Sequence, residues 1–439
     1  MLNPIPNQLL QVCITMKEQY LLDTTTVKTY LTEKLSLFHA DEPLTAEEIG
    51  DGNINYVFRV RSNASGKSII VKQADRLLRS SGRPLDLTRS KREAEALRIY
   101  AACTPQFIPQ VYHYDESMSA ICMEDIAYCG NTRKELMAGK LLPDLFAEDA
   151  AAFLAHAVFP TSDLFIQPEE KKARVKAFIN PELCAISETL VFSEPYCNGK
   201  NRNRVTSGNE VFVSKMLYTD DVLKAEVAAL RETFMNKAEA LIHGDLHTGS
   251  VFIRIDEGDE VSGSSGMKII DPEFAFYGPI GYDLGNLIAN LYFAWIYTVF
   301  SGTQGKDTPL TEHKSGRIAA AIEALPQLFT AKALEQCRTA PLSDPLYNER
   351  YIRKRLAEIV AEAYGYAGTE MIRRTVGDTK VAELDAMGTD TRRISAERIL
   401  INTARLLIKR RQQAGIGTRA AAYFRSSLKT LPDGAVFEH

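Results

Sequence analysis

Short apolar runs rich in β-branched and aromatic residues fill the chain up to about residue 125, and they predict strands. Five such runs are separated by polar or glycine-containing turns: residues 46–49, 54–60, 68–72, 107–114 and 120–125. Runs of this length bounded by turn residues are typical of strands. Among them, Lys91–Tyr100 has helix-forming composition and apolar residues at helical spacing. We therefore expect a small antiparallel β lobe with one helix.

The pattern then changes to helical periodicity. The clearest segment is Tyr282–Trp295, whose apolar residues recur every three or four positions and predict a buried helix. Four more helices are predicted at 147–158, 221–240, 351–364 and 396–412. Polar stretches at Cys197–Asn209 and Ser301–His313 are long enough to be substrate loops. The predicted fold class is α+β and bilobal, with an N-lobe of residues 1–125 and a larger, mostly helical C-lobe of residues 126–439.

Two strand-like runs of the C-lobe each end in carboxylates. The first, Leu241-Ile242, breaks at His243-Gly244-Asp245, and the second, Met267–Ile270, is followed by Asp271-Pro272-Glu273. A polar tip joins the two runs, so they have the pattern of a hairpin with acids on one rim. Such a rim suits a catalytic base and a metal ion.

The bulk composition is that of an ordinary globular protein. The 439 residues are 45% hydrophobic and 25% charged, which is enough for two or three packed cores. The net charge of −4 offers no basic field for nucleic acid or an anionic membrane surface. A small-molecule partner is therefore expected.

The cysteines and the N-terminus favour a soluble cytoplasmic protein. The seven cysteines include no Cys-x-x-Cys pair, which is typical of reduced thiols. The N-terminus lacks the pattern of a signal peptide, and no apolar run is long enough to span a bilayer.

The N-lobe offers contacts for a nucleoside triphosphate. In the turn Gly50–Asn55, glycines let backbone N–H groups approach phosphates closely, although a hairpin turn without a ligand has the same pattern. Lys72 on the following strand and Glu93 on the predicted helix match a strand lysine held by a helix glutamate. Glu95 is a rival partner for Lys72, and a surface lysine with a solvated carboxylate is the simpler alternative.

The carboxylates on the predicted rim have distinct candidate roles. Asp245 can accept a hydrogen bond from a substrate hydroxyl and take its proton late in the reaction, whereas an Asx-turn is the structural alternative. Asp271 and Glu273 are hard oxygen donors that can flank Mg²⁺, with Pro272 restricting the backbone between them. A capped turn is the alternative for this pair.

Two histidines and one further aspartate lie near these acids. His243 and His247 are four residues apart, but strand-like surroundings and Gly244 argue against a helical zinc-ligand pair. We expect His243 to brace the loop and leave His247 unassigned. Asp283 is expected to be a helix N-terminal carboxylate or a loop brace.

Two adjacent arginines, Arg373 and Arg374, lie between glycines far downstream. Adjacent residues on a helix point about 100° apart, so both can serve one small ligand only from a loop or a helix end. A salt-bridged surface pair is the alternative.

Together these motifs resemble the protein-kinase-like small-molecule kinases, the superfamily of aminoglycoside phosphotransferases and choline kinases. The similarity to the methylthioribose kinase family is closer and extends from about residue 49 to residue 409. It is carried by Gly50–Asn55, His243–Ser250, Asp271–Asp283 and the pair Arg373-Arg374. Ser250 replaces the metal-binding asparagine of many kinases, and Asp271-Pro272-Glu273 replaces Asp-Phe-Gly, as in that family.

The resemblance implies ATP-dependent phosphorylation of the 1-hydroxyl of S-methyl-5-thioribose in methionine salvage, by a homodimer that uses Mg²⁺. It makes Asp245 the catalytic carboxylate and a substrate contact, and it assigns Arg373 and Arg374 to the sugar. The metal ligands expected from the resemblance are Asp271, Glu273 and Ser250. The expected ATP-binding residues are Gly52, Asn53, Asn55, Lys72, Glu93, Glu124, Asp125, Ile126, Asp271 and Glu273.

Two alternatives stay open at this point. An aminoglycoside or choline kinase is the first, but a cationic substrate needs carboxylates or an aromatic box, and Arg373 with Arg374 repels it. A non-catalytic kinase-like scaffold that binds nucleotide is the second. It requires a broken catalytic set, whereas every charged part is present here.

Overall fold

The computed structural model describes residues 19–49, 55–77, 82, 84–254, 266–301, 308–388, 391–413 and 416–429. The chain divides into two compact units. The first contains the described residues up to Lys91 together with Val111–Asp125, and the second contains Arg92–Gln110 and the residues from Ile126 onward. Residues 92–110, which were expected in the N-lobe, thus group with the second unit.

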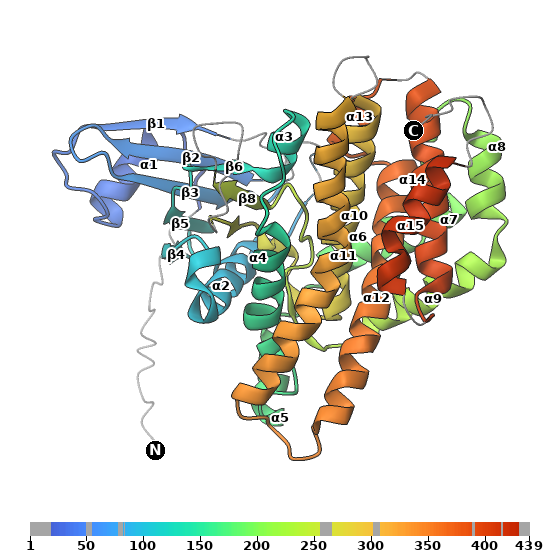
Figure 1. The fold of residues 1–439 in the computed structure, drawn as a ribbon. Helices are drawn as coiled ribbons and strands as arrows, with labels where there is room; N and C mark the ends of the chain where they lie inside the picture. Colours follow the sequence, from blue (N-terminus) through green and yellow to red (C-terminus); the bar gives the residue numbers. More distant parts are fainter. Residues whose placement is uncertain are drawn as a thin grey trace, which may run out of the picture. The chain divides into compact units, whose positions relative to one another are not determined.

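The first unit is built on a five-stranded antiparallel sheet with strand order β1-β2-β3-β5-β4 (Figure 1). The strands are β1 (Leu44–Glu48), β2 (Asn55–Ser62), β3 (Ser68–Ala74), β4 (Val111–Asp115) and β5 (Ala120–Glu124). The predicted antiparallel β lobe is therefore confirmed. The strand predicted from residue 107 begins only at Val111, because Pro105–Phe107 forms a 3-10 turn.

Alternate residues of the sheet bury one face against the short helical segments α1 (Thr26–Thr29) and Tyr30–Lys34. Phe58 and Val60 of β2 and Ile69 and Val71 of β3 belong to this core. The period-two pattern of the sequence thus matches a half-buried strand surface. In the same sheet Lys72 lies opposite Val57 on one neighbouring strand and opposite Ile121 on the other.

The second unit is mostly helical, and two small sheets carry its candidate site. One sheet has the order β6-β8-β9, and the other pairs β7 with β10. These strands are β6 (Cys129–Asn131), β7 (Ala240–Ile242), β8 (Val251–Arg254), β9 (Lys268–Ile269) and β10 (Phe276–Gly278). The hairpin predicted between Leu241-Ile242 and Met267–Ile270 is wrong: β7 pairs with β10, and β9 pairs antiparallel with β8, because the turn at His243-Gly244-Asp245 separates β7 from β8.

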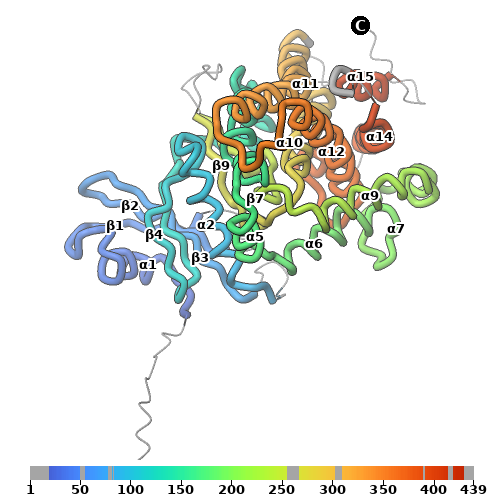
Figure 2. The backbone as a smooth tube through the Cα atoms, turned by 90° about the horizontal axis from the view of Figure 1, so that it is seen from below, coloured from blue at the N-terminus to red at the C-terminus, as the bar shows by residue number. Residues whose placement is uncertain are grey.

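The helices follow in chain order (Figures 1 and 2). They are α2 (Thr88–Cys103), which spans the division between the units, α3 (Thr132–Met137), α4 (Phe146–Phe153), α5 (Pro168–Ala177), α6 (Pro181–Phe192), α7 (Glu194–Cys197), α8 (Glu210–Val213), α9 (Asp221–Asn236), α10 (Ile280–Ser301), α11 (Thr308–Thr339), α12 (Glu349–Val376), α13 (Ala382–Asp385), α14 (Thr391–Arg410) and α15 (Ile416–Lys429). Helix α12 packs against both α10 and α14.

Glycines set how closely these three helices approach. A Cβ on Gly285 of α10 would lie 2.5 Å from the carbonyl oxygen of Ala363 on α12. A Cβ on Gly368 of α12 would lie 2.6 Å from the carbonyl oxygen of Ala404 on α14. Only glycine fits where backbones approach this closely. The close packing keeps α12 continuous through Gly368 up to the two arginines.

Some predicted boundaries are wrong. The helix predicted to reach Ala240 ends at Asn236, because the next residues enter β7. The loop predicted at 301–313 is partly helix, since α11 already begins at Thr308. Its polar first turn has no apolar stripe, so the sequence pattern concealed it. In the described part of the chain, no helix has the length and hydropathy of a membrane span.

Candidate active site

A sharp turn after β7 presents Asp245. Gly244 has a φ of +81°, and a Cβ there would lie 2.4 Å from the carbonyl oxygen of Phe274. A left-handed residue in such close contact has to be glycine. The His-Gly-Asp sequence therefore folds so that the strand ends and the aspartate follows immediately on the loop.

Side chains on both sides hold this loop in place. Asp283, in the first turn of α10, accepts the N–H groups of His243 at 2.6 Å and of Gly244 at 2.9 Å. The Nε2 atom of His243 lies 2.9 Å from the carbonyl oxygen of Ile270, and its Nδ1 accepts the N–H of Asp245 at 3.3 Å. The loop-bracing roles expected of His243 and Asp283 are confirmed. Burial raises the pKa of Asp283 to about 7, although both N–H groups act to lower it.

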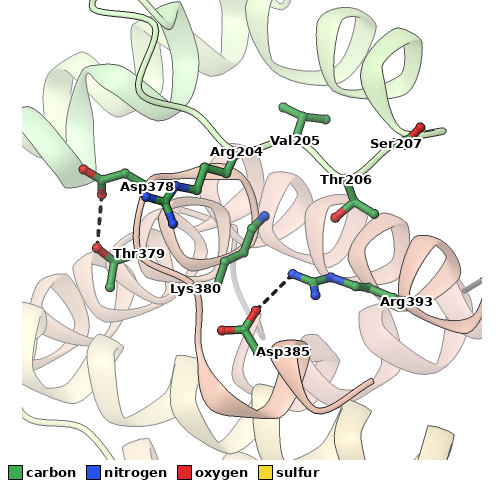
Figure 3. Close-up of a pocket in the computed structure, with 9 residues that line it drawn as sticks. All are labelled: Arg204, Val205, Thr206, Ser207, Asp378, Thr379, Lys380, Asp385 and Arg393. Atoms are coloured by element: carbon green, nitrogen blue, oxygen red, sulfur yellow. Dashed lines mark hydrogen bonds and ion pairs between the residues drawn. The ribbon is translucent and has the colours of Figure 1, made fainter. Parts of the chain in front are cut away.

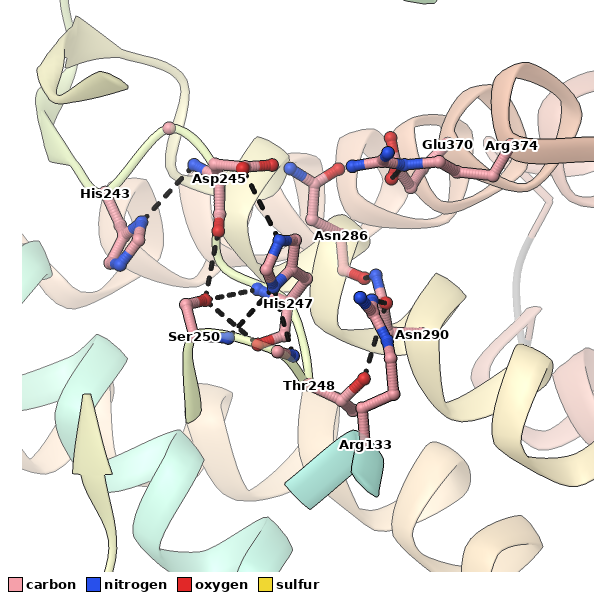
Figure 4. A network of polar contacts seen from close by, with 12 residues as sticks. Arg133, His243, Asp245, His247, Thr248, Ser250, Asn286, Asn290, Glu370 and Arg374 are labelled. Atoms are coloured by element: carbon pink, nitrogen blue, oxygen red, sulfur yellow. Dashed lines mark hydrogen bonds and ion pairs between the residues drawn. The ribbon is translucent and has the colours of Figure 1, made fainter. Parts of the chain in front are cut away.

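His247, which the sequence left unassigned, lies beside Asp245 (Figure 4). Its Nδ1 accepts the N–H groups of Gly249 at 3.1 Å and of Ser250 at 2.9 Å. Its Nε2 lies 3.5 Å from Oδ2 of Asp245. Burial lowers the pKa of His247 to about 4, and the attraction of Asp245 does not compensate. The ring is therefore neutral at pH 7, with its single proton on Nε2, facing the carboxylate.

Ser250 closes the same loop. Its hydroxyl accepts the N–H of His247 at 3.0 Å and lies 3.1 Å from the carbonyl oxygen of Asp245 and 2.9 Å from that of His247. A hydroxyl has one proton and two lone pairs, so at most one lone pair is left for another partner. Ser250 thus fixes the conformation of the loop.

Asp245 itself is ionised and accessible. Burial acts to raise its pKa, but His247, Arg374 and Arg373 outweigh burial and lower it to about 2. Nη2 of Arg373 lies 3.7 Å from Oδ1 of Asp245, and 28% of the aspartate side chain is exposed. A carboxylate in this state can accept a hydrogen bond from an approaching hydroxyl group.

The two arginines lie in the last turn of α12. The sequence allowed a loop or a helix end, and the structure shows a helix end. Both arginines bind Glu370, whose side chain is 1% exposed: Nε of Arg373 donates to Oε2, and Nε of Arg374 donates to Oε1 at 3.0 Å. Sequence reasoning missed Glu370. Its position three and four residues before the arginines was the available signal.

Two of the three expected metal ligands, Asp271 and Glu273, follow β9. Asp271 has a φ of +74° and precedes the 3-10 turn Pro272–Phe274, in which Glu273 is buried. Within the described residues there is no group of three or more His, Cys, Asp or Glu side chains that could hold a metal ion. Two carboxylates nevertheless fit Mg²⁺, which takes one or two carboxylates and completes its shell with phosphate oxygens and water.

The expected nucleotide contacts lie mainly in the first unit. Gly52 and Asn53 fall outside the described residues. Asn55 is buried, and its Oδ1 accepts a hydrogen bond from Arg89 at 3.0 Å. The Asp125 carboxylate binds Nε of Arg59 at 2.8 Å and the Ser68 hydroxyl at 2.6 Å. The Asp125 carboxylate is thus engaged within the first unit, and its backbone groups are the expected contact for a nucleotide.

The remaining expected contacts are a lysine, two glutamates and Ile126. Lys72 is buried on β3, and Glu124 ends β5. Glu93 on α2 is buried and belongs to the second unit, so its pairing with Lys72 stays a prediction. Ile126 is the first residue of the second unit after β5.

The second unit also contains a cavity of about 500 Å³ (Figure 3). None of the expected site residues lines it; its lining is Arg204, Val205, Thr206, Ser207, Asp378, Thr379, Lys380, Asp385 and Arg393. Every guanidinium nitrogen of Arg393 already donates to the protein, to Glu397 at 3.1 Å, to the Gly388 carbonyl at 3.1 Å and to Asp385 at 3.2 Å. The cavity therefore offers less free charge than its basic lining suggests.

Comparison with known proteins agrees with this geometry. The profile described as the phosphotransferase enzyme family matches residues 45–307. A methylthioribose kinase from Geobacillus thermodenitrificans is 38% identical over 88% of this chain and 92% of its own length. One from Bacillus pumilus is 34% identical over 91% of this chain and 95% of its own length.

The chain belongs to the methylthioribose kinase family. The family expected from the sequence is thereby confirmed, and with it the assignment as a kinase. Among solved structures, a choline kinase from Cryptosporidium parvum is 13% identical, with a TM-score of 0.44, and the match covers 93% of this chain and 96% of that one. This similarity is too low to say more about a methylthioribose kinase family member.

Proposed function

We propose that this protein transfers the γ-phosphoryl group of ATP to the 1-hydroxyl of S-methyl-5-thioribose, giving S-methyl-5-thioribose 1-phosphate in methionine salvage. The observation that carries the proposal is Asp245: an accessible, ionised carboxylate 3.7 Å from Arg373, in a chain of the methylthioribose kinase family. A carboxylate accepts a hydroxyl hydrogen bond, and the arginines supply charge for the transferred group.

Asp245 orients the attacking hydroxyl. The sugar oxygen forms a bond to the γ-phosphorus while the bond from that phosphorus to the ADP oxygen breaks. In a loose transition state the hydroxyl becomes acidic only late, so a carboxylate with a low pKa can still take the proton. The negative charge of the incoming phosphoryl group attracts Arg373 and Arg374. Because their electrostatic effect on Asp245 then weakens, the pKa of Asp245 rises and the carboxylate becomes a better base.

Asp271 and Glu273 would hold Mg²⁺, and Ser250 would add one hydroxyl oxygen. When bound, the ion neutralises phosphate charge. Support comes from the buried carboxylate of Glu273 and from the position of Asp271 two residues after the end of β9. We assign the phosphates to Gly52, Asn53, Asn55 and Lys72, with Glu93 holding the lysine. Adenine is assigned to the backbone of Glu124, Asp125 and Ile126.

The two rival activities have less support. Aminoglycosides and choline are cations that need a surplus of negative charge, whereas the charges of Arg373 and Arg374 offset those of Asp245 and Glu370 here. A non-catalytic scaffold has no use for a carboxylate kept ionised in a largely buried place. We further propose a cytoplasmic homodimer, which light scattering tests as a mass twice the 48.9 kDa of one chain.

The decisive experiment is ADP release by the purified protein with Mg²⁺ and ATP. We expect turnover with methylthioribose and none above background with choline or kanamycin. Equal turnover on all three would overturn the substrate assignment. ³¹P NMR of the product would check that the phosphate is on the 1-hydroxyl.

A further inference from the structure

Glu370 lies one helical turn before the twin arginines on α12 and touches both. Oε2 accepts Nε–H of Arg373, and Oε1 accepts Nε–H of Arg374 at 3.0 Å. Residues three and four positions apart are neighbours on a helix surface, so Glu370 lies between the two arginines that it binds. The same carboxylate is buried, with 1% of its side chain exposed.

This contact overcomes the divergence of adjacent helix residues. Arg373 and Arg374 leave the helix about 100° apart. Because Glu370 binds the Nε atom of each, both guanidinium groups are anchored at one point and keep their Nη donors for other partners. One of these donors, Nη2 of Arg373, lies 3.7 Å from Oδ1 of Asp245. Figure 4 shows Glu370 and Arg374 together on one side of the network, with Asn286 drawn between them and Asp245.

The cluster is also balanced in charge. The arginines contribute two positive charges, while Asp245 and Glu370 contribute two negative ones, and His247 is neutral. Burial acts to raise the pKa of Glu370, but Arg373 and Arg374 lower it, so the carboxylate stays ionised. An electrically balanced pocket suits a neutral sugar and does not hold an anionic product tightly.

We propose that Glu370 is a positioning residue of the sugar site: it joins Arg373 and Arg374 into one fork and limits the positive charge of that fork. The inference rests on the proposed function, since the fork is assigned to the sugar and the transferred phosphoryl group. Glu370 then controls both how the sugar is bound and how readily a phosphorylated product dissociates.

The test is Glu370→Gln, which keeps the size of the side chain and removes its charge. We expect the methylthioribose KM to rise and kcat to fall, with the ATP KM unchanged. Inorganic phosphate, titrated calorimetrically at low salt, should bind about tenfold more tightly, because the fork then carries an uncompensated charge. In Glu370→Gln/Arg374→Ala the gain in phosphate affinity should disappear.

Glu239→Gln is the matched control. The Glu239 side chain is 9% exposed and accepts Nε–H of Arg355 at 2.7 Å, but Arg355 keeps Glu358 and Glu362 as acidic partners and therefore gains no uncompensated charge. The control variant should lower the unfolding temperature without changing phosphate affinity. If Glu370→Gln binds phosphate no more tightly than wild type does, Glu370 is only structural and the inference is wrong.

Two further results keep the test decisive. If Glu370→Gln does not fold, Glu370→Asp keeps the charge on a shorter side chain. It should raise the sugar KM and leave phosphate affinity unchanged, and a tightened phosphate affinity there would contradict the charge argument. Failure of the proposed function is a separate observation, because it would appear as no ADP release by wild type with methylthioribose.

Discussion

At the scale of single residues, Asp245 keeps its charge where burial alone would favour the neutral acid. We predict that Asp245→Asn retains ATP affinity and lowers kcat by about 10²–10⁴-fold, the usual contribution of a positioned acid–base group. Asparagine still fits the space but cannot take the hydroxyl proton. Single-turnover kinetics and calorimetric ATP titration measure the two quantities.

Asp385→Asn is a suitable control for that variant. Asp385 also binds an arginine, with Oδ1 3.2 Å from Nη2 of Arg393, but it is exposed and lines the cavity of Figure 3. It should have wild-type kinetics. Near-wild-type transfer by Asp245→Asn would contradict the mechanism.

Replacing either arginine should change mainly the KM, whereas replacing Asp245 should change mainly kcat. We predict that Arg373→Ala and Arg374→Ala each raise the methylthioribose KM by about tenfold to a hundredfold, as expected for a lost charge-assisted hydrogen bond. The ATP KM should change little. Steady-state kinetics with each substrate varied separately provides the measurement. A larger rise in the ATP KM than in the methylthioribose KM would assign the arginines to the nucleotide site.

The same variants change the pH dependence. Arg374 and Arg373 help to lower the pKa of Asp245 to about 2, so in wild type this carboxylate is ionised at neutral and mildly acidic pH. Removing either cation raises the pKa of Asp245. The acid limb of the kcat profile should therefore shift toward higher pH in both variants.

At the scale of elements, α10 positions the catalytic loop through Asp283. We predict that Asp283→Asn lowers the free energy of unfolding by about 1–3 kcal/mol, because an amide accepts only one of the two N–H groups and turns its own donor toward the other. Urea unfolding measures this loss, and kcat should fall with it as the loop loosens.

Asp221→Asn is the control for the helix position. Asp221 is likewise in the first turn of its helix, α9, but its side chain is 93% exposed. Only small losses, from the helix dipole and from the exposed ion pair with Lys224, are expected there. Equal losses of unfolding free energy in the two variants would mean that Asp283 stabilises α10 and not the catalytic loop.

Elements also show what the sequence could and could not predict. Apolar residues at helical spacing identified Tyr282–Trp295, which lies in the buried helix α10, and period-two alternation identified the strands of the first unit because one face of them is buried. Periodicity failed after Tyr364, where the helix predicted at 351–364 ended although α12 continues through Gly368 to Val376. That glycine is required by the approach of Ala404 from α14, a contact between residues far apart in sequence.

The candidate site likewise has features that the sequence predicts and features that only the structure shows. The His-Gly-Asp and Asp-Pro-Glu motifs are local in sequence, so the carboxylates could be found without a structure. The brace from Asp283 to His243 joins residues 40 positions apart, and the neutral state of His247 depends on its burial. Such relations arise only when the chain is folded.

At the scale of the whole molecule, buried acids determine how stability depends on pH. Burial raises the pKa of Asp283 to about 7, and burial with the charge of Glu362 raises the pKa of Glu239. Unfolded carboxyl groups lose their protons near pH 4. Between about pH 6.5 and pH 8 the folded protein thus binds more protons than the unfolded chain, so stability falls as pH rises.

His247 has the opposite effect, but at lower pH. Its pKa is lowered to about 4 in the folded protein, so its contribution is present above the usual histidine pKa near 6.5 and is lost as pH falls. We therefore predict a urea midpoint that decreases from pH 6.5 to pH 8. Glu239→Gln should flatten this decrease, because it removes a proton that the folded state retains. The control Glu232→Gln, at an exposed position, should leave the decrease unchanged. An unchanged slope in Glu239→Gln would show that Glu239 is already ionised at neutral pH. Arg355, whose Nε donates to Glu239 at 2.7 Å, would then stabilise the charged form.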